Sequence, residues 1–301
     1  MPSSRITQYR RLDGWQNSGM SETGTDRYGV MGYPVSQSRS PVIHRLFALQ
    51  TNQDLQYELL QVAPDKLETA VRQFGRTGGK GLNITAPHKG EVARLVDDMS
   101  ERASVAGAVN TVIFRENSLY GDNTDGVGLI TDLKVNHEFK LFDANILILG
   151  AGGATRGIIS PLLEEEPGSI VIANRTYDKA RSLADHFSQQ GPVNACRFED
   201  VRSLPIYDLI INATSAGLKG EIPPYPEEAV HPTTFCYDLS YGLSPTPFTR
   251  WAAKLGAGKS VMGWGMLVEQ AAESFYLWRG VRPETASVLK QLSVNIQTDN
   301  G

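Results

Sequence analysis

The chain has 301 residues, a formal net charge of −4 and a pI of about 5.8. Because this length exceeds what one compact core usually holds, we expect two domains. The chain lacks the basic excess of a dedicated nucleic-acid binder, and no apolar run reaches the roughly 18 residues needed to span a bilayer. Its two cysteines, Cys196 and Cys236, match no zinc-ligand spacing, so we predict no metal site and two buried, reduced thiols.

The first 26 residues are polar and aperiodic, and we expect them to form a tail that precedes the folded chain. Arg5, Arg10 and Arg11 would fit an import peptide, but Asp13 and the absence of an amphipathic period oppose that interpretation. The segment also lacks the apolar stretch of a secretory signal. These absent signals lead us to expect a cytoplasmic protein.

Strand-like and helix-like runs alternate from Tyr28 onward. We predict strands over residues 28–32, 57–62 and 81–85, and helices over residues 41–50, 65–74 and 89–96. A hairpin is predicted next, with strands at 109–114 and 118–121. This order of elements indicates a first α/β domain.

A second α/β block follows, and its strands are short and continuously apolar. We predict strands over residues 145–149, 169–173, 208–213, 235–239 and 259–262, with helices over 155–163 and 179–187. Apolar strands that alternate with helices are typical of a parallel sheet covered on both faces. The last strong helix, 266–278, comes after this block, and periodicity alone does not decide whether it returns to the first domain.

A glycine-rich turn follows the first strand of the second block. It consists of Gly150, Ala151, Gly152, Gly153 and Ala154, and Thr155 stands where a third glycine is usual. Such a turn between a strand and a helix lets backbone N–H groups approach a pyrophosphate at the positive helix end. A purely structural turn is the alternative, but the strand before the turn and the helix after it favour a dinucleotide site.

The next strand is followed by Asn174, Arg175 and Thr176, with Lys179 close behind. A site for NAD usually has an acidic residue here, and this residue binds the ribose hydroxyls. A guanidinium and an ammonium would instead attract a 2′-phosphate. The alternative is a solvated basic turn, but its position relative to the glycine turn favours NADP.

Polar residues gather at two predicted helix starts in the first domain. Ser40 is expected to be an N-cap before Pro41, and Ser38 adds a second hydroxyl there, so the pair would also hold a carboxylate. Pro87 is expected to begin the next helix, with Lys89 in its first turn. A cation in this position opposes the helix dipole. A surface lysine is the alternative interpretation, and a catalytic one is the functional interpretation.

Two further clusters lie at residues 107–111 (Gly-Ala-Val-Asn-Thr) and 121–126 (Gly-Asp-Asn-Thr-Asp-Gly). The second is acid-rich, but an EF-hand count from Asp122 places Leu133 where a bidentate glutamate belongs, which excludes that type of calcium site. A solvated loop remains the alternative.

Together these clusters resemble the shikimate dehydrogenase family, and the resemblance extends from about Tyr28 to about Leu292. The motifs that carry it are residues 38–41, 80–85 with 87–89, 106–111, 121–126, 150–154, 174–176, 211–215 and 265–272. Their shared order and spacing make the resemblance specific. It implies NADPH-dependent, reversible reduction of 3-dehydroshikimate to shikimate, a step in the biosynthesis of chorismate and the aromatic amino acids.

The family fold implied is two α/β domains with the active site between them and C-terminal helices that return to the first domain. We therefore expect a substrate-binding domain over residues 27–124 plus 264–295 and a Rossmann-type NADP-binding domain over 125–263. The expected partner is a small-molecule substrate, with no nucleic acid and no membrane, and the chain is expected to be a monomer or a homodimer.

The resemblance also implies a role for each matched position. Lys89 is similar to the family's acid–base lysine, and Asp125 to its carboxylate partner. The implied substrate ligands, besides Lys89 and Asp125, are Ser38, Ser40, Asn83, Thr85, Asn110, Tyr241 and Gln270. The implied NADP ligands are Gly150, Ala151, Gly152, Gly153, Ala154, Asn174, Arg175, Thr176 and Lys179, with Thr214, Leu239, Gly263 and Met266 on the nicotinamide side.

The sequence departs from the family pattern at three places, none of which removes a group needed for the chemistry. These are Ala86, Leu239 and the segment 262–265 (Met-Gly-Trp-Gly). Three other functions stay open. They are a quinate/shikimate dehydrogenase that uses NAD, an enzyme for an aminated shikimate analogue, and a non-catalytic NADP-binding regulator.

Overall fold

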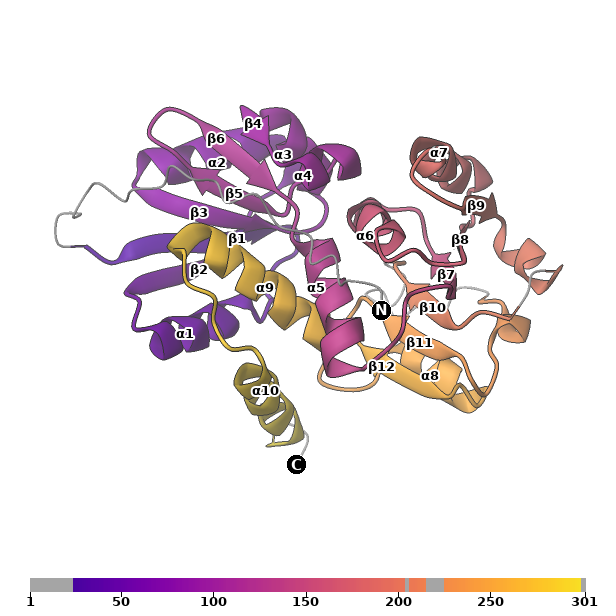
Figure 1. The fold of residues 1–301 in the computed structure, drawn as a ribbon. Coiled ribbons are helices and arrows are strands. Elements are labelled where there is room, and N and C mark those ends of the chain that lie inside the picture. Colours follow the sequence, from indigo (N-terminus) through magenta and orange to yellow (C-terminus); the bar gives the residue numbers. More distant parts are fainter. Residues whose placement is uncertain (1–23, 204–205, 215–224, 299–301) are drawn as a thin grey trace, which may run out of the picture.

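The computed structural model describes residues 24–203, 206–214 and 225–298. Within these ranges the strands form two six-stranded sheets that lie side by side, each covered by helices (Figure 1). The fold is therefore the predicted α/β architecture with two sheets. No helix in the described ranges is long and apolar enough to cross a membrane.

The first sheet has the strand order β2-β1-β3-β5-β6-β4. Its strands are β1 (Asp26–Gly32), β2 (Leu55–Gln61), β3 (Gly79–Ile84), β4 (Asp98–Met99), β5 (Thr111–Phe114) and β6 (Leu119–Asp122). Strand β1 pairs in parallel with β2 and β3, whereas β3, β5 and β6 form an antiparallel meander. The predicted hairpin is thus confirmed. Because β1 begins at Asp26, the fold starts slightly earlier than the expected end of the tail; residues 1–23 lie outside the described ranges.

Four helices accompany this sheet, and they are α1 (Ser40–Thr51), α2 (Leu67–Arg76), α3 (Lys89–Leu95) and α4 (Glu101–Ala106). One apolar cluster on this sheet includes Met31, Leu82 and Val112, against which Val71 of α2 and Val92 of α3 are buried. Burial of aliphatic side chains at this scale is the main stabilising contribution to such a domain. The core thereby fixes the start of α3, which carries Lys89.

The second sheet is entirely parallel, in the order β12-β11-β10-β7-β8-β9. Its strands are β7 (Asn145–Leu149), β8 (Ser169–Ala173), β9 (Val193–Cys196), β10 (Leu209–Asn212), β11 (Phe235–Asp238) and β12 (Lys259–Met262). When β7 to β12 are numbered 1 to 6 and the sheet is read from β9, the order is 3-2-1-4-5-6, which defines the dinucleotide-binding Rossmann fold. The order reverses between β7 and β10, and ligands of such sheets bind at this point.

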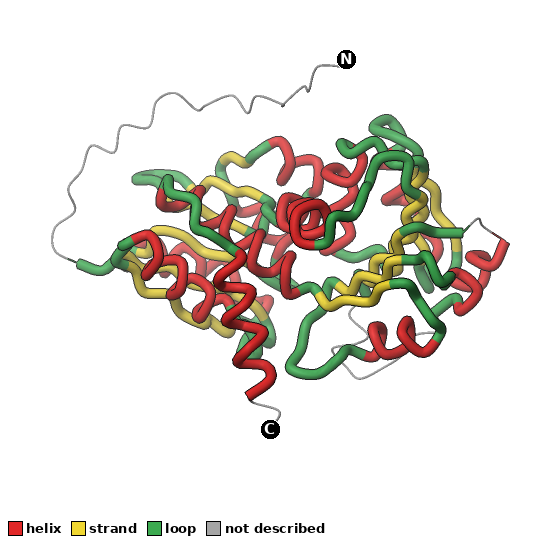
Figure 2. The backbone as a smooth tube through the Cα atoms, turned by 60° about the horizontal axis from the view of Figure 1, so that its bottom comes forward, coloured by secondary structure: helices red, strands yellow, loops and turns green. Residues whose placement is uncertain are grey.

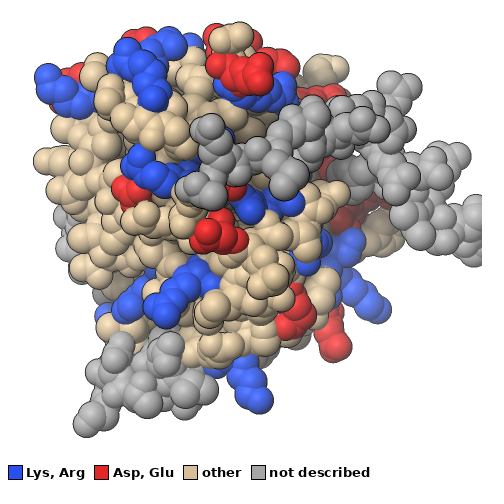
Figure 3. Space-filling view, turned by 90° about the vertical axis from the view of Figure 1, so that its left-hand side faces the viewer, with Lys and Arg blue, Asp and Glu red and all other residues tan. Residues whose placement is uncertain are grey.

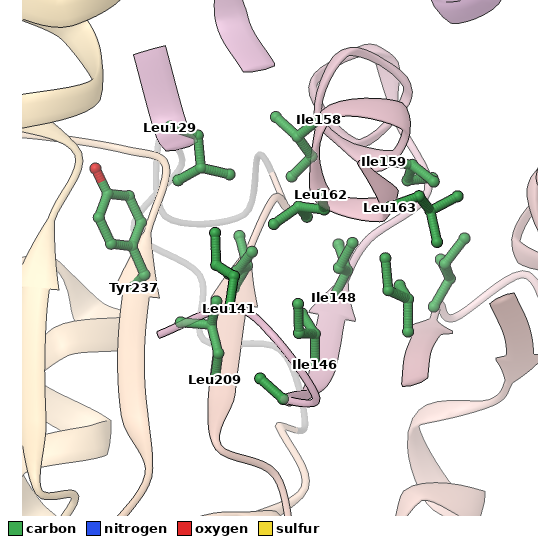
Figure 4. Packing of buried hydrophobic residues seen from close by; sticks show 14 of the residues in the cluster. Leu129, Leu141, Ile146, Ile148, Ile158, Ile159, Leu162, Leu163, Leu209 and Tyr237 are labelled. Carbon is green, nitrogen blue, oxygen red and sulfur yellow. The ribbon is translucent and has the colours of Figure 1, made fainter. Parts of the chain in front are cut away.

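Helices α6 (Gly153–Leu163), α7 (Tyr177–Phe187) and α8 (Pro247–Lys254) cover the second sheet (Figure 2). Figure 4 shows Ile158 and Leu162 of α6 packed over Ile146 and Ile148 of β7, with Leu129 in the same cluster. Continuous burial explains why these strands are apolar at successive positions instead of alternating.

Helices α5 (Asp125–Thr131) and α9 (Trp264–Arg279) pack against each other between the two sheets (Figure 1). Helix α5 also packs on α6, and α9 also packs on α1, β3 and β5. The last helix, α10 (Ala286–Thr298), contacts α9 and α1. The C-terminal helices therefore return to the first domain, as the family resemblance implied.

Charged side chains of both signs are interspersed on the face shown in Figure 3, without a patch of one sign. Of the two cysteines, Cys236 is buried as predicted, but Cys196 is only half-buried because it ends the edge strand β9; both are free thiols. Burial raises the pKa of the Cys236 thiol to about 12 and that of Cys196 to about 11.

Candidate active site

The centre of the candidate site is an ion pair between the first residues of two helices. The Lys89 Nζ donates to Asp125 Oδ2 at 2.5 Å, from α3 to α5. Only 19% of the lysine side chain and 6% of the aspartate side chain are exposed. The helix α3 begins at Lys89, in agreement with the predicted range 89–96, whereas the expectation that Pro87 begins it was wrong because His88 occupies the cap position. His88 is anchored because its Nε2 lies 2.7 Å from the Val62 carbonyl. This contact ties the start of α3, which carries Lys89, to the residue that follows β2.

The Asp125 carboxylate is fixed on its other oxygen as well. The Asn110 Nδ2 donates to Asp125 Oδ1 at 2.8 Å, and the Asp125 backbone N–H donates to Asn123 Oδ1 at 3.1 Å. Both asparagines are buried. Because a carboxylate with fixed partners does not rotate freely, the lysine it holds has one preferred position. The cluster 121–126, for which a solvated loop was the alternative, thus ends in a helix start with a buried carboxylate.

Gln270 of α9 reaches the same place from the C-terminal part of the chain. Its Oε1 lies 3.4 Å from Asn110 Nδ2 and 3.4 Å from Thr124 Oγ1. Ser274, one turn further along α9, accepts a hydrogen bond from Asn83 Nδ2 at 3.0 Å. The structure therefore brings together four predicted residues, Lys89, Asn110, Asp125 and Gln270. Thr124 and Ser274 were not predicted as site residues; both are small buried polar residues, Thr124 within the 121–126 motif and Ser274 just beyond the 265–272 motif.

A second group of predicted residues lies around the start of α1. The Ser38 hydroxyl donates to the buried Ser40 hydroxyl at 3.1 Å. Tyr241 interacts with Ser38 and with the Arg39 backbone, and burial raises the pKa of its phenol. The prediction that Ser40 is the N-cap was wrong, because α1 begins at Ser40 and Arg39 occupies the cap position without a side-chain cap. Ser40 is therefore available for other partners.

Asn83 connects the two groups, since its Nδ2 also lies 3.3 Å from the Asn110 carbonyl. Its Oδ1 accepts from the Tyr57 hydroxyl at 2.7 Å. Thr85, the remaining predicted substrate ligand, lies in the loop between β3 and Lys89, with its methyl group directly over Gly32. We observe no side-chain hydrogen bond from Thr85 to the other predicted residues among those described.

The glycine turn lies at the carboxyl end of β7 and borders a hollow of about 400 Å³. Gly150 has a φ of +107°, a conformation that residues with a side chain rarely adopt. A Cβ at Gly152 or Gly153 would meet no atom within 4 Å, so the turn leaves space for a ligand against its backbone. Thr155, where a glycine was usual, donates from its hydroxyl to the Gly150 carbonyl at 2.9 Å and so closes the turn.

The hollow is lined by Ala151, Gly152, Gly153, Arg156, Asp178, Lys179 and Ser182. The structure thus brings Lys179 to the glycine turn, whereas Arg175 is not among the lining residues. Asn174 and Arg175 instead form the turn after β8, where Asn174 Nδ2 donates to the Thr176 carbonyl at 2.9 Å. Arg156 was missed, although a basic residue in the second turn of the helix that follows a glycine turn is a usable signal.

The residues assigned to the nicotinamide side lie at the carboxyl ends of β10, β11 and β12. The Thr214 hydroxyl donates to Asn212 Oδ1 at 2.8 Å, and the Leu239 N–H donates to the Asn212 carbonyl at 3.0 Å. Gly263 precedes α9, and a Cβ there would lie 2.7 Å from the Leu239 carbonyl oxygen. The Met266 N–H donates to the Tyr237 hydroxyl at 3.3 Å. Ser215, the last residue of the 211–215 motif, lies outside the described residues.

A Rossmann sheet with an open glycine turn, next to an α/β sheet that carries a buried Lys–Asp pair, defines a two-domain, nucleotide-dependent oxidoreductase. Three family models match the chain: the shikimate dehydrogenase substrate binding domain over residues 30–112, shikimate / quinate 5-dehydrogenase over 133–219, and the shikimate 5′-dehydrogenase C-terminal domain over 263–292. The chain belongs to the shikimate dehydrogenase family.

Individual relatives agree with this membership. The chain is 52% identical over 268 residues to the NADP(+) shikimate dehydrogenase of Alkalilimnicola ehrlichii, covering 89% of this chain and 98% of the relative. It is 51% identical over 277 residues to that of Methylococcus capsulatus, covering 92% and 99%. The solved shikimate 5-dehydrogenase of Thermus thermophilus, in complex with NADP(H) and shikimate, is 31% identical with a TM-score of 0.80, covering 90% of this chain and 100% of that one.

Proposed function

We propose that this chain catalyses the reversible, NADPH-dependent reduction of 3-dehydroshikimate to shikimate, in the biosynthesis of chorismate and the aromatic amino acids. The observation that carries the proposal is the buried Lys89–Asp125 ion pair, 2.5 Å long, in a chain that belongs to the shikimate dehydrogenase family. A regulator without catalysis would not need a largely buried ammonium paired with a carboxylate that a second side chain holds in place. The NADP(+) relatives at about 50% identity support this cofactor over NAD.

The glycine turn and the hollow beside it have the chemistry that a dinucleotide phosphate requires. Open backbone at Gly152 and Gly153 lies at the N-terminus of α6, where free N–H groups and the helix dipole favour an anion. Lys179 and Arg156 supply positive charge for the 2′-phosphate, opposed by Asp178 in the same hollow. We assign the turn at Asn174, Arg175 and Thr176 to the adenosine end. Thr214, Leu239, Gly263 and Met266 are assigned to the nicotinamide end.

Lys89 is assigned the proton transfer. When bound, NADPH supplies the hydride for the carbonyl carbon, and negative charge develops on the carbonyl oxygen. Lys89 donates a proton from Nζ to that oxygen, which lowers the barrier. In the reverse direction, the neutral amine accepts the proton from the substrate hydroxyl. Asp125 holds the Nζ through Oδ2, and Asn110 prevents the carboxylate from turning.

The other predicted polar residues are assigned to the substrate by charge and position. Ser38, Ser40 and Tyr241 present hydroxyl groups near the start of α1 and are assigned to the substrate carboxylate. Asn83, Thr85, Asn110 and Gln270, together with Lys89 and Asp125, are assigned to the ring oxygens. This separation of an anion site from a hydroxyl site would orient the ring so that one carbon faces the cofactor.

The domain limits stay predictions: a substrate domain over 27–124 plus 264–295 and an NADP domain over 125–263. A monomeric or homodimeric state and a cytoplasmic location also remain proposals, as does the absence of a nucleic-acid or membrane partner.

The proposal is tested by initial rates of NADP reduction at 340 nm with shikimate, measured beside NAD and beside quinate. We expect fast turnover only with shikimate and NADP. Turnover of comparable efficiency with quinate or with NAD would indicate a quinate/shikimate dehydrogenase instead. Tight NADP binding without any turnover of shikimate would indicate a non-catalytic NADP-binding protein.

A further inference from the structure

A tyrosine that lies outside the assigned ligands connects the two halves of the substrate site. Tyr57 is in β2, and its hydroxyl donates to Asn83 Oδ1 at 2.7 Å. The same hydroxyl interacts with Ser40 at the start of α1. Tyr57 therefore bridges a residue assigned to the substrate carboxylate and a residue assigned to a ring hydroxyl.

The Tyr57 hydroxyl determines how the Asn83 side chain is oriented. The Asn83 amide is buried, and Tyr57 occupies its oxygen. Its nitrogen then faces three acceptors, Asn110 O, Thr111 Oγ1 and Ser274 Oγ, at 3.0–3.3 Å. Without the phenol, Oδ1 would lose this 2.7 Å hydrogen bond in a buried position, which is unfavourable, and the orientation of the amide would be less firmly fixed.

The ring of Tyr57 is itself held by a histidine. His44 of α1 is fully buried and stacks on Tyr57, with ring centroids 4.2 Å apart and an interplanar angle of 8°. Trp278 and Phe275 of α9 complete the aromatic surround of the imidazole, with centroids at 5.4 and 6.1 Å. Burial lowers the pKa of His44 to about 3, so the imidazole is neutral and stacks as an aromatic ring would.

We propose that Tyr57, clamped by His44, is a positioning residue that sets the orientation of Asn83 and Ser40 for the substrate. The inference rests on the proposed function, since it concerns the same substrate site. Burial also raises the pKa of the Tyr57 phenol, which keeps the hydroxyl protonated as a donor.

The chain contains a matched control. Tyr28 of β1 lies directly opposite Tyr57 in the parallel register and packs on Trp278. Its hydroxyl accepts from Arg279 instead and has no contact with Ser40 or Asn83 among the described hydrogen bonds. Tyr28→Phe therefore removes a tyrosine hydroxyl from the paired position on the neighbouring strand, and it leaves the hydrogen bonds of Ser40 and Asn83 unchanged.

The test compares Tyr57→Phe, Tyr28→Phe, Asn83→Ala and the double variant Tyr57→Phe/Asn83→Ala with the parent enzyme in steady-state shikimate oxidation. We expect Tyr57→Phe to raise the KM for shikimate about tenfold, or about 1.4 kcal/mol, with the KM for NADP unchanged and kcat changed less than about threefold. Tyr28→Phe should leave all three constants unchanged. The double variant should have the KM of Asn83→Ala alone, because the phenol acts through the amide.

Three results would overturn the inference. The first is an unchanged KM for shikimate in Tyr57→Phe, and the second is that the KM effects of Tyr57→Phe and Asn83→Ala multiply in the double variant. An equal rise of the shikimate KM in Tyr28→Phe would also overturn it, because the effect would then follow from a weakened sheet. A parent enzyme that does not oxidise shikimate would refute the proposed function itself, so the two failures are distinguishable.

Discussion

Lys179 provides a direct test of how the hollow beside the glycine turn discriminates NADP from NAD. It is the one predicted basic residue that the structure places in this hollow, and it lies on the exposed first turns of α7. Replacement by alanine removes one positive charge next to the position assigned to the 2′-phosphate. The backbone at Gly152 and Gly153, which is assigned to the pyrophosphate common to both cofactors, stays in place.

The size of the effect follows from the exposure of the site. A charge-assisted hydrogen bond contributes about 1.5–3 kcal/mol when shielded, and an exposed ion pair contributes about 0.2–1 kcal/mol. Lys179 is exposed but shares the hollow with Arg156, which stays positive. We therefore expect an intermediate loss, and the KM for NADP should rise about five- to tenfold in Lys179→Ala. The ratio of the KM for NADP in Lys179→Ala to that in the parent should shrink at high ionic strength, because salt screens exposed charges.

The assay is the KM for NADP and for NAD, each at saturating shikimate, in the parent and in Lys179→Ala. The KM for NAD should change less than about twofold, since NAD has no 2′-phosphate. Arg181→Ala is the matched control on the same helix, because Arg181 pairs with Asp185 outside the hollow; it should change neither constant. An equal rise for NAD and NADP in Lys179→Ala would refute the assignment of Lys179 to the 2′-phosphate.

Two further predictions concern the helices that join the two sheets. Burial raises the pKa of Glu269, although hydrogen bonds to Thr285 and Asn136 oppose the shift, so its ionised form destabilises the folded chain. The free energy of unfolding should therefore fall as the pH rises from the pKa of Glu269 in the unfolded chain through its raised pKa in the folded chain. The melting temperature of Glu269→Gln relative to the parent should accordingly increase from pH 4 to pH 7, and a constant difference would contradict this. A Cβ at Gly126 would lie 2.2 Å from Pro161 Cγ, so Gly126→Ala should force α5 away from α6. We expect a loss of about 1–3 kcal/mol in unfolding free energy by denaturant titration, and unchanged stability would show that the contact relaxes.

Much of the Rossmann half could be predicted from the sequence because its strands are continuously apolar and its turns contain glycines. The predicted bounds of the strands at 145–149, 169–173 and 259–262 agree with β7, β8 and β12. The edge strand β9 and the helix α8 were not predicted, since both are short and mix polar with apolar residues. Such elements depend on packing against neighbours that local patterns do not reveal.

Helix α5 shows most clearly why part of the site could not be predicted. Its first residues, Asp125 and Gly126, have the composition of a loop, and a helix of 7 residues is too short to be stable alone. Contacts with α6 and α9 stabilise it, and Gly126 and Gly128 permit the close approach. The helical position of Asp125 therefore depends on tertiary packing, although the motif itself identified the residue.

Tyr57 and His44 were missed for a related reason. A tyrosine in a strand pattern and a histidine in an amphipathic helix are each typical of a core, and their stacking joins β2 to α1 only in the folded chain. Arg156, in contrast, was missed although its position in the helix after the glycine turn is a usable signal. The motifs predicted the residues proposed as ligands, whereas the residues proposed to orient them became visible through their contacts.

Proton transfer by Lys89 is tested most directly by the kcat of Lys89→Ala. The variant is to be compared with Lys80→Ala, an exposed lysine of the preceding strand β3, and the affinity for NADP is to be measured in parallel. Loss of a positioned acid–base group should lower kcat by about 10²–10⁴-fold, with NADP affinity unchanged and with Lys80→Ala fully active. A kcat of Lys89→Ala close to that of the parent enzyme would contradict the account.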